Sequence, residues 1–260
     1  MFQALQELID YKCMIGSMVK REIRGRYKGS LLGFLWNFLT PIVQILIYIL
    51  VFTHVFRPSL ENYAIYLTCS MILWIFFSES LMESSHVLVS NSDMLKKIYF
   101  PRAVLPIASV LSKMVNFLIM LGIFFVIALV TGYGVCIPAL LTLLIFIPIF
   151  LLFLLGFSLL LSAIDVYLRD VEYMTTVIMM VLIWLTPVMY AKDQFDSSLL
   201  NTLITINPMT YFVEVIQDIL YWKCVPSLTL MLTCLGIAVL LFVVGALVFR
   251  HLEQDFAEVM

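Results

Sequence analysis

The sequence changes from basic to apolar across Arg24-Gly25-Arg26-Tyr27-Lys28-Gly29-Ser30-Leu31-Leu32-Gly33-Phe34-Leu35-Trp36, and the apolar run continues to Phe56. Six basic residues lie in the first thirty positions: Lys12, Lys20, Arg21, Arg24, Arg26 and Lys28. Beyond them the sequence is almost uncharged for longer than the ~20 residues that a helix needs to cross a bilayer. Because Lys and Arg beside a span are retained in the cytoplasm, this stretch predicts a transmembrane helix that follows a cytoplasmic amino terminus.

The composition indicates an integral membrane protein. Of the 260 residues, 63% are hydrophobic and 12% are charged, and the mean hydropathy is +1.08. A soluble core of this size could not bury so much apolar surface. The formal net charge of -2 is less informative than the position of the charges, which lie in the gaps between apolar runs. The five cysteines lack metal-ligand spacing, although Cys136 and Cys224 would both lie near the outer face and could pair.

The apolar runs predict six transmembrane helices. They cover about residues 31–56, 63–82, 106–130, 137–163, 174–190 and 227–249. The first contains Pro41, which predicts a kink, and Pro187 is predicted to interrupt the fifth. Six spans return the carboxyl terminus to the cytoplasm. Twelve of the fifteen Lys and Arg then lie in inner segments, with Lys113 counted at the start of the third span, and the outer segments hold Arg57, Lys192 and Lys223. This asymmetry supports the predicted orientation.

Residues 1–30 predict an amphipathic helix that lies in the cytoplasmic membrane interface. Hydrophobic residues recur at helical spacing on one arc: Leu5, Leu8, Ile9, Ile15, Val19 and Ile23. We expect this arc to face lipid. The residues expected to face the headgroups are Lys20, Arg21, Arg24, Arg26, Tyr27 and Lys28. A plain positive anchor with no further role would explain the same residues.

The outer segment 191–226 is too long for a simple turn and too polar to cross the membrane. Within it, Asn207-Pro208 predicts an N-cap followed by proline at the first helical position. An apolar face follows at helical spacing: Met209, Phe212, Val213, Ile216, Ile219 and Leu220. The opposite face is polar: Thr210, Glu214, Gln217 and Asp218. We expect a short helix at the outer interface, either re-entrant and buried in protein or an inert lid on the lipid surface.

The sequence lacks the motifs of nucleotide and metal chemistry. It contains no G-x-x-x-x-G-K-[ST] phosphate loop, so it does not by itself bind nucleotide in that manner. The three histidines, His54, His86 and His251, fall at separate span ends with no partner at ligand spacing, and no metal site is expected. Ionisable residues inside a membrane mark ion or proton paths, and the middle of each predicted span lacks one.

Charged residues gather at two inner positions. Glu79 and Glu83 share a helical face with His86 and could form a relay, although carboxylates that face solvent or headgroups are the commoner case. A second charged group lies in the loop after the fourth span: Asp165, Arg169, Asp170 and Glu172. A contact of Asp165 with Arg169, four residues later, is the simplest explanation for it. Aromatic residues within the spans could stack on sugar rings or, more commonly, face lipid: Tyr48, Phe52, Trp74, Phe77, Trp184 and Tyr190.

Several motifs, taken together and in order, resemble one family. They are Arg26-Tyr27-Lys28-Gly29-Ser30-Leu31-Leu32-Gly33 with Trp36 and Pro41, Leu95-Lys96-Lys97-Ile98-Tyr99-Phe100-Pro101, Arg169-Asp170, Thr186-Pro187-Val188-Met189-Tyr190 and Asn207-Pro208-Met209-Thr210. The sequence resembles the permease subunit of ABC exporters for lipid-linked polysaccharides, the family that moves O-antigen, capsule and teichoic-acid polymers. The resemblance runs from about residue 10 to the carboxyl terminus.

The resemblance implies a role for each segment of one transmembrane domain over residues 1–260. Residues 1–30 would be the interface helix, 31–190 spans one to five, 191–226 the outer gate segment, and 227–260 the sixth span and cytoplasmic tail. A coupling helix at 91–99 would dock on the ATPase through Asn91, Asp93, Met94, Leu95, Lys96, Lys97 and Tyr99. The outer gate would contain Asn207, Pro208, Tyr211, Phe212 and Glu214. The six aromatic residues of the spans would line the channel.

The resemblance also implies the partners. Two copies would form a homodimer in the bacterial cytoplasmic (inner) membrane with two ATPase subunits, which would hold the ATP and Mg, while this chain would bind no cofactor and no nucleic acid. The cargo would be a polyprenyl-diphosphate-linked polysaccharide. A permease of the same fold for a drug or smaller lipid is the nearest alternative. An ion-coupled transporter would need midplane carboxylates, and a membrane transferase would need a catalytic cluster, for which Asp165, Asp170 and Glu172 are the candidates.

Overall fold

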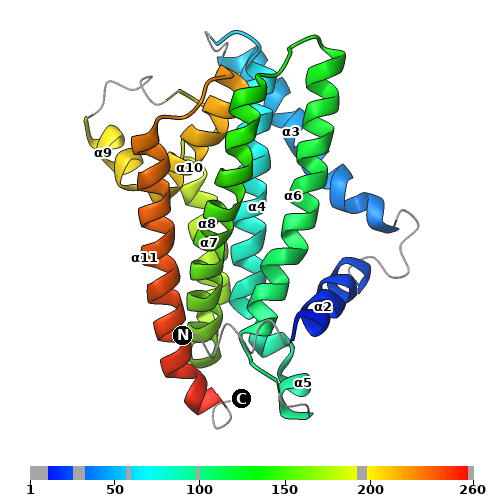
Figure 1. Cartoon of the computed structure of the whole chain (residues 1–260), viewed down its shortest axis with the longest axis vertical. Helices are drawn as coiled ribbons and strands as arrows, with labels where there is room; N and C mark the ends of the chain where they lie inside the picture. Colours follow the sequence, from blue (N-terminus) through cyan, green and yellow to red (C-terminus); the bar gives the residue numbers. More distant parts are fainter. Residues whose placement is uncertain (1–10, 26–32, 57–59, 98–99, 192–197, 257–260) are drawn as a thin grey trace.

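The computed structural model of the chain describes residues 11–25, 33–56, 60–97, 100–191 and 198–256 (Figure 1). Within these ranges the regular structure is helical and no strand occurs, which confirms the predicted all-helical class. The long helices run side by side. At one end of this bundle lie α2 (Lys12–Gly25) and α5 (Ser92–Lys97), and toward the other lie α9 (Ser198–Ile206) and α10 (Pro208–Gln217). We call these the α5 end and the α10 end.

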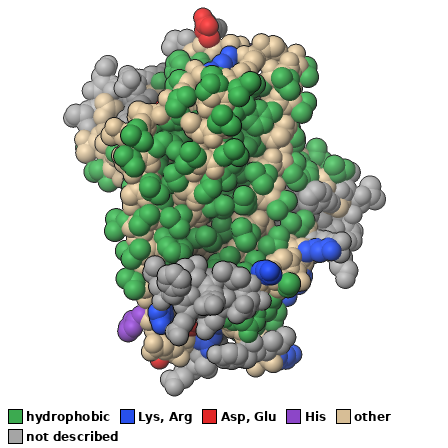
Figure 2. Space-filling view, in the orientation of Figure 1, with side chains coloured by type: hydrophobic (Ala, Val, Ile, Leu, Met, Phe, Trp, Pro, Cys, Tyr) green, Lys and Arg blue, Asp and Glu red, His purple; other side chains and the backbone are tan. Residues whose placement is uncertain are grey.

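Four helices in the described ranges are long and apolar enough to cross a membrane: α4 (Tyr63–Ser90), α6 (Val104–Val130), α7 (Ile137–Tyr167) and α11 (Leu228–Leu252), the last continued by η5 (Glu253–Asp255). α4 is the most deeply buried of them and packs against both α6 and α7. Hydrophobic side chains cover the middle of the face seen in Figure 2, and charged ones lie toward its two ends. The chain is therefore a multi-pass membrane protein.

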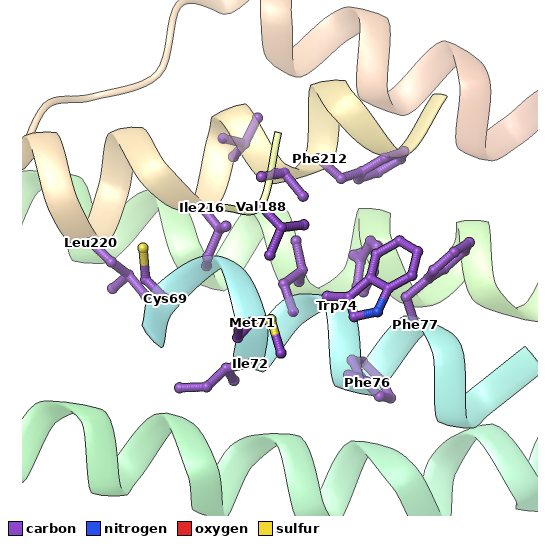
Figure 3. Close-up of a cluster of buried hydrophobic side chains, with 14 of the residues drawn as sticks. Cys69, Met71, Ile72, Trp74, Phe76, Phe77, Val188, Phe212, Ile216 and Leu220 are labelled. Carbon is purple, nitrogen blue, oxygen red and sulfur yellow. The ribbon is translucent and has the colours of Figure 1, made fainter. Parts of the chain in front are cut away.

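Aromatic rings from α4, α7 and α10 form the centre of the core. The ring of Phe77 stacks on that of Phe153 at 5.8 Å, and the ring of Phe153 lies 4.4 Å from that of Phe212. Figure 3 shows Phe77 on α4 and Phe212 on α10 toward the same end of the buried cluster. Aromatic pairs at these separations add to the dispersion energy of a close-packed interior. This core joins α10 firmly to the long helices.

α7 and α11 cross at two facing glycines, Gly156 and Gly245. A Cβ atom placed on Gly245 would lie 2.1 Å from the backbone oxygen of Gly156. Small residues at such crossings let the backbones of membrane helices approach closely. Glycine is therefore required at this crossing.

The first predicted span is shorter and less regular than the sequence suggests. Its described part consists of η1 (Gly33–Leu35), α3 (Trp36–Val51) and the π-helical η2 (Phe52–Phe56). Pro41 lies inside α3 and is buried. The apolar helix here is shorter than the four helices above.

The fifth predicted span, 174–190, is only partly helical. α8 (Asp170–Leu182) begins four residues before it and ends eight residues early, and residues 183–190 form turns. Pro187 has no amide hydrogen and cannot continue a regular helix. Pro187 was predicted to interrupt this span, but the helix ends earlier, with turns from residue 183, because hydropathy does not distinguish a helix from apolar turns.

α9 and α10 form a bent pair. Together with η4 (Asp218–Trp222) they pass the length and composition test for a span, but they meet at an angle of 83°. The predicted N-cap is confirmed, because Asn207 Oδ1 accepts a hydrogen bond from the Met209 amide at 3.0 Å. Thr210 and Gln217, expected on an outward polar face, are buried. Of the two expected arrangements, the structure therefore favours a helix buried in protein over a lid on the lipid.

Candidate functional site

α5 presents charge to the surface at one end of the molecule. It follows α4 after a single turn at Asn91, and none of its six residues is buried. Asp93 in its first turn and Lys96 and Lys97 in its last are exposed, an order that suits the helix dipole. Met94 and Leu95 pack against the core of the α5 end. The helix is thus anchored on one side and exposes charged side chains on the other.

α2 is joined to α5 by Arg21. The guanidinium donates a hydrogen bond from Nη2 to Asn91 Oδ1 at 2.7 Å, and Nη1 lies 3.6 Å from Met94 Sδ. The structure therefore connects two segments that the sequence predicts separately, the interface helix and the coupling helix. Lys20 is exposed nearby on α2. The side chain of Arg24 and the predicted site residues Arg26, Tyr27, Lys28 and Tyr99 lie outside the described residues.

The apolar arc of α2 packs on the protein. Met18 is buried, and Ile15 and Val19 pack with it against a cluster that includes Leu105 and Val166. The expectation that this arc faces lipid is therefore corrected. Helical spacing identifies an apolar face, but it does not tell whether lipid or another helix covers that face.

The carboxyl-terminal segment holds the other side of the α5 end. The Arg102 side chain donates a hydrogen bond to the backbone oxygen of Glu253, and its backbone amide donates to Glu253 Oε1 at 3.3 Å. The Arg102 guanidinium also lies 5.5 Å from the ring centre of Phe256, which is fully buried. Residues that immediately follow α11 are thereby fixed beside the connection between α5 and α6.

At the α10 end, side chains from distant helices hold the turns at 183–190. Tyr63 and Tyr66 of α4 donate hydrogen bonds to the backbone oxygens of Met189 at 2.7 Å and Tyr190 at 2.8 Å. Gln217 Nε2 donates to the backbone oxygen of Pro187 at 2.8 Å. Backbone oxygens inside a membrane protein need such partners wherever the helix is interrupted. No role was predicted for Tyr63 or Tyr66 from the sequence.

The corner between α9 and α10 is also fixed by hydrogen bonds. Asn207 Nδ2 donates to Thr186 Oγ1 at 2.8 Å and to the Leu185 backbone oxygen at 3.2 Å, which ties the corner to the turns after α8. The Tyr211 hydroxyl donates to the Thr205 backbone oxygen at 3.0 Å. Of the other predicted gate residues, Phe212 is in the core, whereas Pro208 and Glu214 are partly exposed.

A cavity of about 330 Å³ lies between α4, α8 and this corner. Its lining is apolar except for one amide, and it includes Phe77, Leu81, Ile178, Leu203, Asn207 and Pro208. Phe77 was predicted to line the channel, and Asn207 and Pro208 were predicted to form the gate. The structure brings these three residues to one cavity. An apolar cavity of this kind suits hydrocarbon better than a sugar chain.

The other predicted channel residues are spread through the chain. Trp74 is buried beside Phe77 in the core (Figure 3), and Trp184 is 58% exposed. Tyr48 and Phe52 are half-buried, with ring centres 6.5 Å apart. Tyr190 is half-buried, and its hydroxyl donates to the Trp184 backbone oxygen at 2.8 Å.

The carboxylates on α4 are paired. Glu79 and Glu83 each lie 3.4 Å from Lys113 Nζ, although the sequence favoured solvent or headgroups as their surroundings. α4 continues to Ser90, eight residues past its predicted border at Met82, so both carboxylates lie inside the helix. Lys113 was counted at the start of the third span, but it lies in the tenth position of α6.

Comparison with known proteins identifies the family. Residues 14–221 match the family described as ABC-2 type transporter. The chain belongs to the ABC-2 transporter family. It is similar to the O-antigen export system permease protein RfbA of Myxococcus xanthus, with 30% identity over 264 residues and 99% of each chain covered. It is also 27% identical, over 79% of each chain, to a protein of the same name from Klebsiella pneumoniae.

Membership of the ABC-2 transporters confirms the family resemblance drawn from the motifs. The family match contains most of α2, all of α5 and the helices α9 and α10, and the similarity to the Myxococcus protein continues through α11. The chain is a transport subunit rather than an enzyme, because members of this family act with an ABC ATPase on a separate chain. The roles of individual residues of this ABC-2 transporter remain predictions.

Proposed function

We propose that this chain is the transmembrane permease subunit of an ATP-driven exporter that moves a polyprenyl-diphosphate-linked polysaccharide, of the O-antigen type, across the bacterial cytoplasmic membrane. The observation that carries this proposal is the 30% identity over the whole chain to an O-antigen export system permease. Similarity of this extent includes the α5 end and the α10 end alike. It favours polysaccharide export over a drug or a smaller lipid as cargo.

Six spans complete the proposed topology. α3 with η2 and α8 with the turns at 183–190 join the four long helices, and the bent pair is re-entrant from the outer face. The stretch from Trp36 to Phe56 would be ~30 Å long as a helix, which is the thickness of the hydrocarbon core. With six spans, α2 and α5 lie on the cytoplasmic side together with both termini. The α10 end then faces outward.

The assembly we propose is a homodimer with two ATPase subunits, which bind the ATP and Mg that drive transport. Two surfaces support self-association. α8 exposes most of its apolar residues, including Val177, Val181 and the neighbouring Trp184, and α3 exposes Val43 and Ile47. A second copy or lipid would cover these faces. The channel for the polymer would lie between the copies.

Within this assembly α5 would dock on the ATPase, and the corner at Asn207 would act as the outer gate. Exposed Lys96 and Lys97 on a short helix anchored by Arg21 support the docking role. The hydrogen bonds from Asn207 to the turns after α8 support the gating role, because movement of either segment would be passed to the other. The apolar cavity beside this corner would accept the lipid part of the cargo.

The test is purification of the tagged chain from its native membrane, followed by mass spectrometry of the native complex and of bound lipids. We expect two copies of this chain with two copies of an ABC ATPase, and a polyprenyl diphosphate sugar among the lipids. ATP hydrolysis should depend on the presence of both chains. A chain that purifies without any ATPase would overturn the proposal, and a complex that binds only a drug-like molecule or a small lipid would favour the same-fold alternative.

A further inference from the structure

Lys113 is a buried cation held between two carboxylates. It lies in α6 and is 3% exposed. Its Nζ is 3.4 Å from Glu79 Oε2 and 3.4 Å from Glu83 Oε2, which are one turn apart on α4. Both carboxylates keep part of their surface exposed. The two helices are thus joined by charge well inside an apolar segment.

Contacts between ionisable side chains continue to a third helix. His86, one turn further along α4, has Nε2 3.9 Å from Glu83 Oε1 and Nδ1 3.8 Å from Glu172 Oε1. Glu172 lies in the first turn of α8. Asp165 of α7, which is 2% exposed, lies near enough to interact with both His86 and Glu172. We call Glu79, Glu83, His86, Lys113 and Glu172 the Lys113 cluster.

Stability alone does not explain the Lys113 cluster. Burying a charge costs on the order of several kcal/mol per ion. Replacement of a buried ion pair by hydrophobic residues of similar volume often leaves a protein equally or more stable. The cluster also holds more carboxylates than cations, so it would repel a phosphate rather than bind one. Ionisable residues inside a span are retained for function. The remaining role is to control how α4, α6 and α8 sit against one another.

The position of the cluster in the chain indicates what it controls. α4 continues from Glu83 and His86 to Asn91, where α5 begins. α8 continues from Glu172 to the turns at 183–190, which are hydrogen-bonded to Asn207 at the corner of the bent pair. The cluster therefore lies where the helix that carries α5 meets the helix that leads to the α10 end.

We propose that the Lys113 cluster is the joint that transmits movement of α5 to α8 during each ATP cycle, with Lys113 and His86 as positioning residues. Displacement of α5 would move the end of α4, and the contacts from Glu83 through His86 to Glu172 would draw α8 with it. Lys113 would hold the same turns of α4 against α6, which fixes the pivot. This inference rests on the proposed docking role of α5.

The first test separates transmission from stability by removing all three charges at the pivot. The variant is Lys113→Met, Glu79→Gln, Glu83→Gln, which leaves no unpaired buried charge and should fold. We expect it to keep its thermal stability in detergent and its bound ATPase. The amount of polymer exported per ATP hydrolysed should fall by about fivefold, which is the lower end of the coupling typically found between two sites. Wild-type export per ATP in this variant would overturn the role of Lys113.

The second test addresses the link to α8 and does not depend on the buried pivot. His86 and Glu172 are partly exposed, so the variant His86→Gln, Glu172→Gln should fold. We expect lower export per ATP with unchanged ATPase binding. The matched control is Arg250→Met, which removes an exposed cation at the α5 end of α11 and should export normally. Normal export by the His86→Gln, Glu172→Gln variant would overturn the link, and this variant decides alone if the triple variant does not fold.

Failure of the proposed role of the Lys113 cluster and failure of the proposed docking role of α5 give different results. If α5 is not the docking helix, reversal of its surface charge leaves ATPase binding unchanged, whatever the Lys113 variants do. If α5 docks but the Lys113 cluster transmits nothing, ATPase binding depends on α5 while export per ATP is normal in both cluster variants.

Discussion

Tyr63, Tyr66 and Gln217 hold the turns at 183–190 through side-chain hydrogen bonds to backbone oxygens. Gln217 also donates to Ser70 Oγ at 2.8 Å, so its side-chain amide joins α10, α4 and the turns. A buried backbone oxygen that loses its donor costs free energy because no water replaces the bond. These residues therefore shape the α10 end individually.

We expect Gln217→Met to lower the free energy of unfolding by about 1–2 kcal/mol, because it keeps the volume but removes both hydrogen bonds. Thermal unfolding of the purified chain in detergent measures the change. Gln44→Met is the matched control, since Gln44 is exposed on α3 and the same substitution should be close to neutral there. Equal stability of the two variants would contradict the role given to Gln217.

The sequence predicts some of these residues and misses others for a physical reason. The Asn207 cap was predicted because its partner, the Met209 amide, lies two residues away and cap chemistry is local. The partner of Tyr63 is 126 residues away, and no local pattern reveals it. Lys113 was visible as a charge near an apolar run, but its pairing with Glu79 depends on how α4 and α6 pack.

At the scale of helices, the lengths of the apolar runs predicted the ends of some helices and not of others. They predicted α6, α7 and α11 within a few residues, because each is a continuous apolar run. They ended α4 too early, since Lys113 neutralises carboxylates that resemble the end of a span. They also extended the fifth span through residues that form turns, because most residues of those turns are apolar whether or not they are helical.

The crossing of α7 and α11 gives a prediction at this scale. We expect Gly245→Ala to destabilise the chain by about 1–3 kcal/mol, because the new methyl group collides with the backbone of Gly156. Gly236→Ala on the same helix is the control, since nothing lies within 4 Å of its Cβ position. It should be neutral or slightly stabilising. Similar unfolding temperatures for both variants would show that the helices do not cross at Gly156.

At the scale of the whole molecule, the two ends are built differently. The α5 end has an exposed charged helix that Arg21 contacts, and Arg102 fixes the carboxyl-terminal segment at the same end. The α10 end has a corner and turns that bind one another through buried polar groups. Long helices connect the two ends, as a transporter driven from one side of a membrane requires.

We expect Lys96→Glu, Lys97→Glu to weaken association with the ATPase and to uncouple hydrolysis from export, because α5 then presents the opposite charge to its partner. Co-purification and export per ATP in membrane vesicles measure both effects. Arg250→Glu is the control, an exposed charge reversal at the same end of α11. Unchanged association and export in the α5 variant would exclude α5 as the docking element, provided that the protein is inserted normally.

The bracing of α5 also bears on how such exporters can recombine. Asn91 at the start of α5 binds Arg21 of α2, and the segment that follows α5 binds Glu253 beyond α11. A chimaera that receives a foreign segment 91–102 alone would separate Arg21 and Glu253 from their hydrogen-bond partners. Exchange of ATPase partners between two permeases therefore requires three pieces of chain to be inherited together, although they are far apart in the gene.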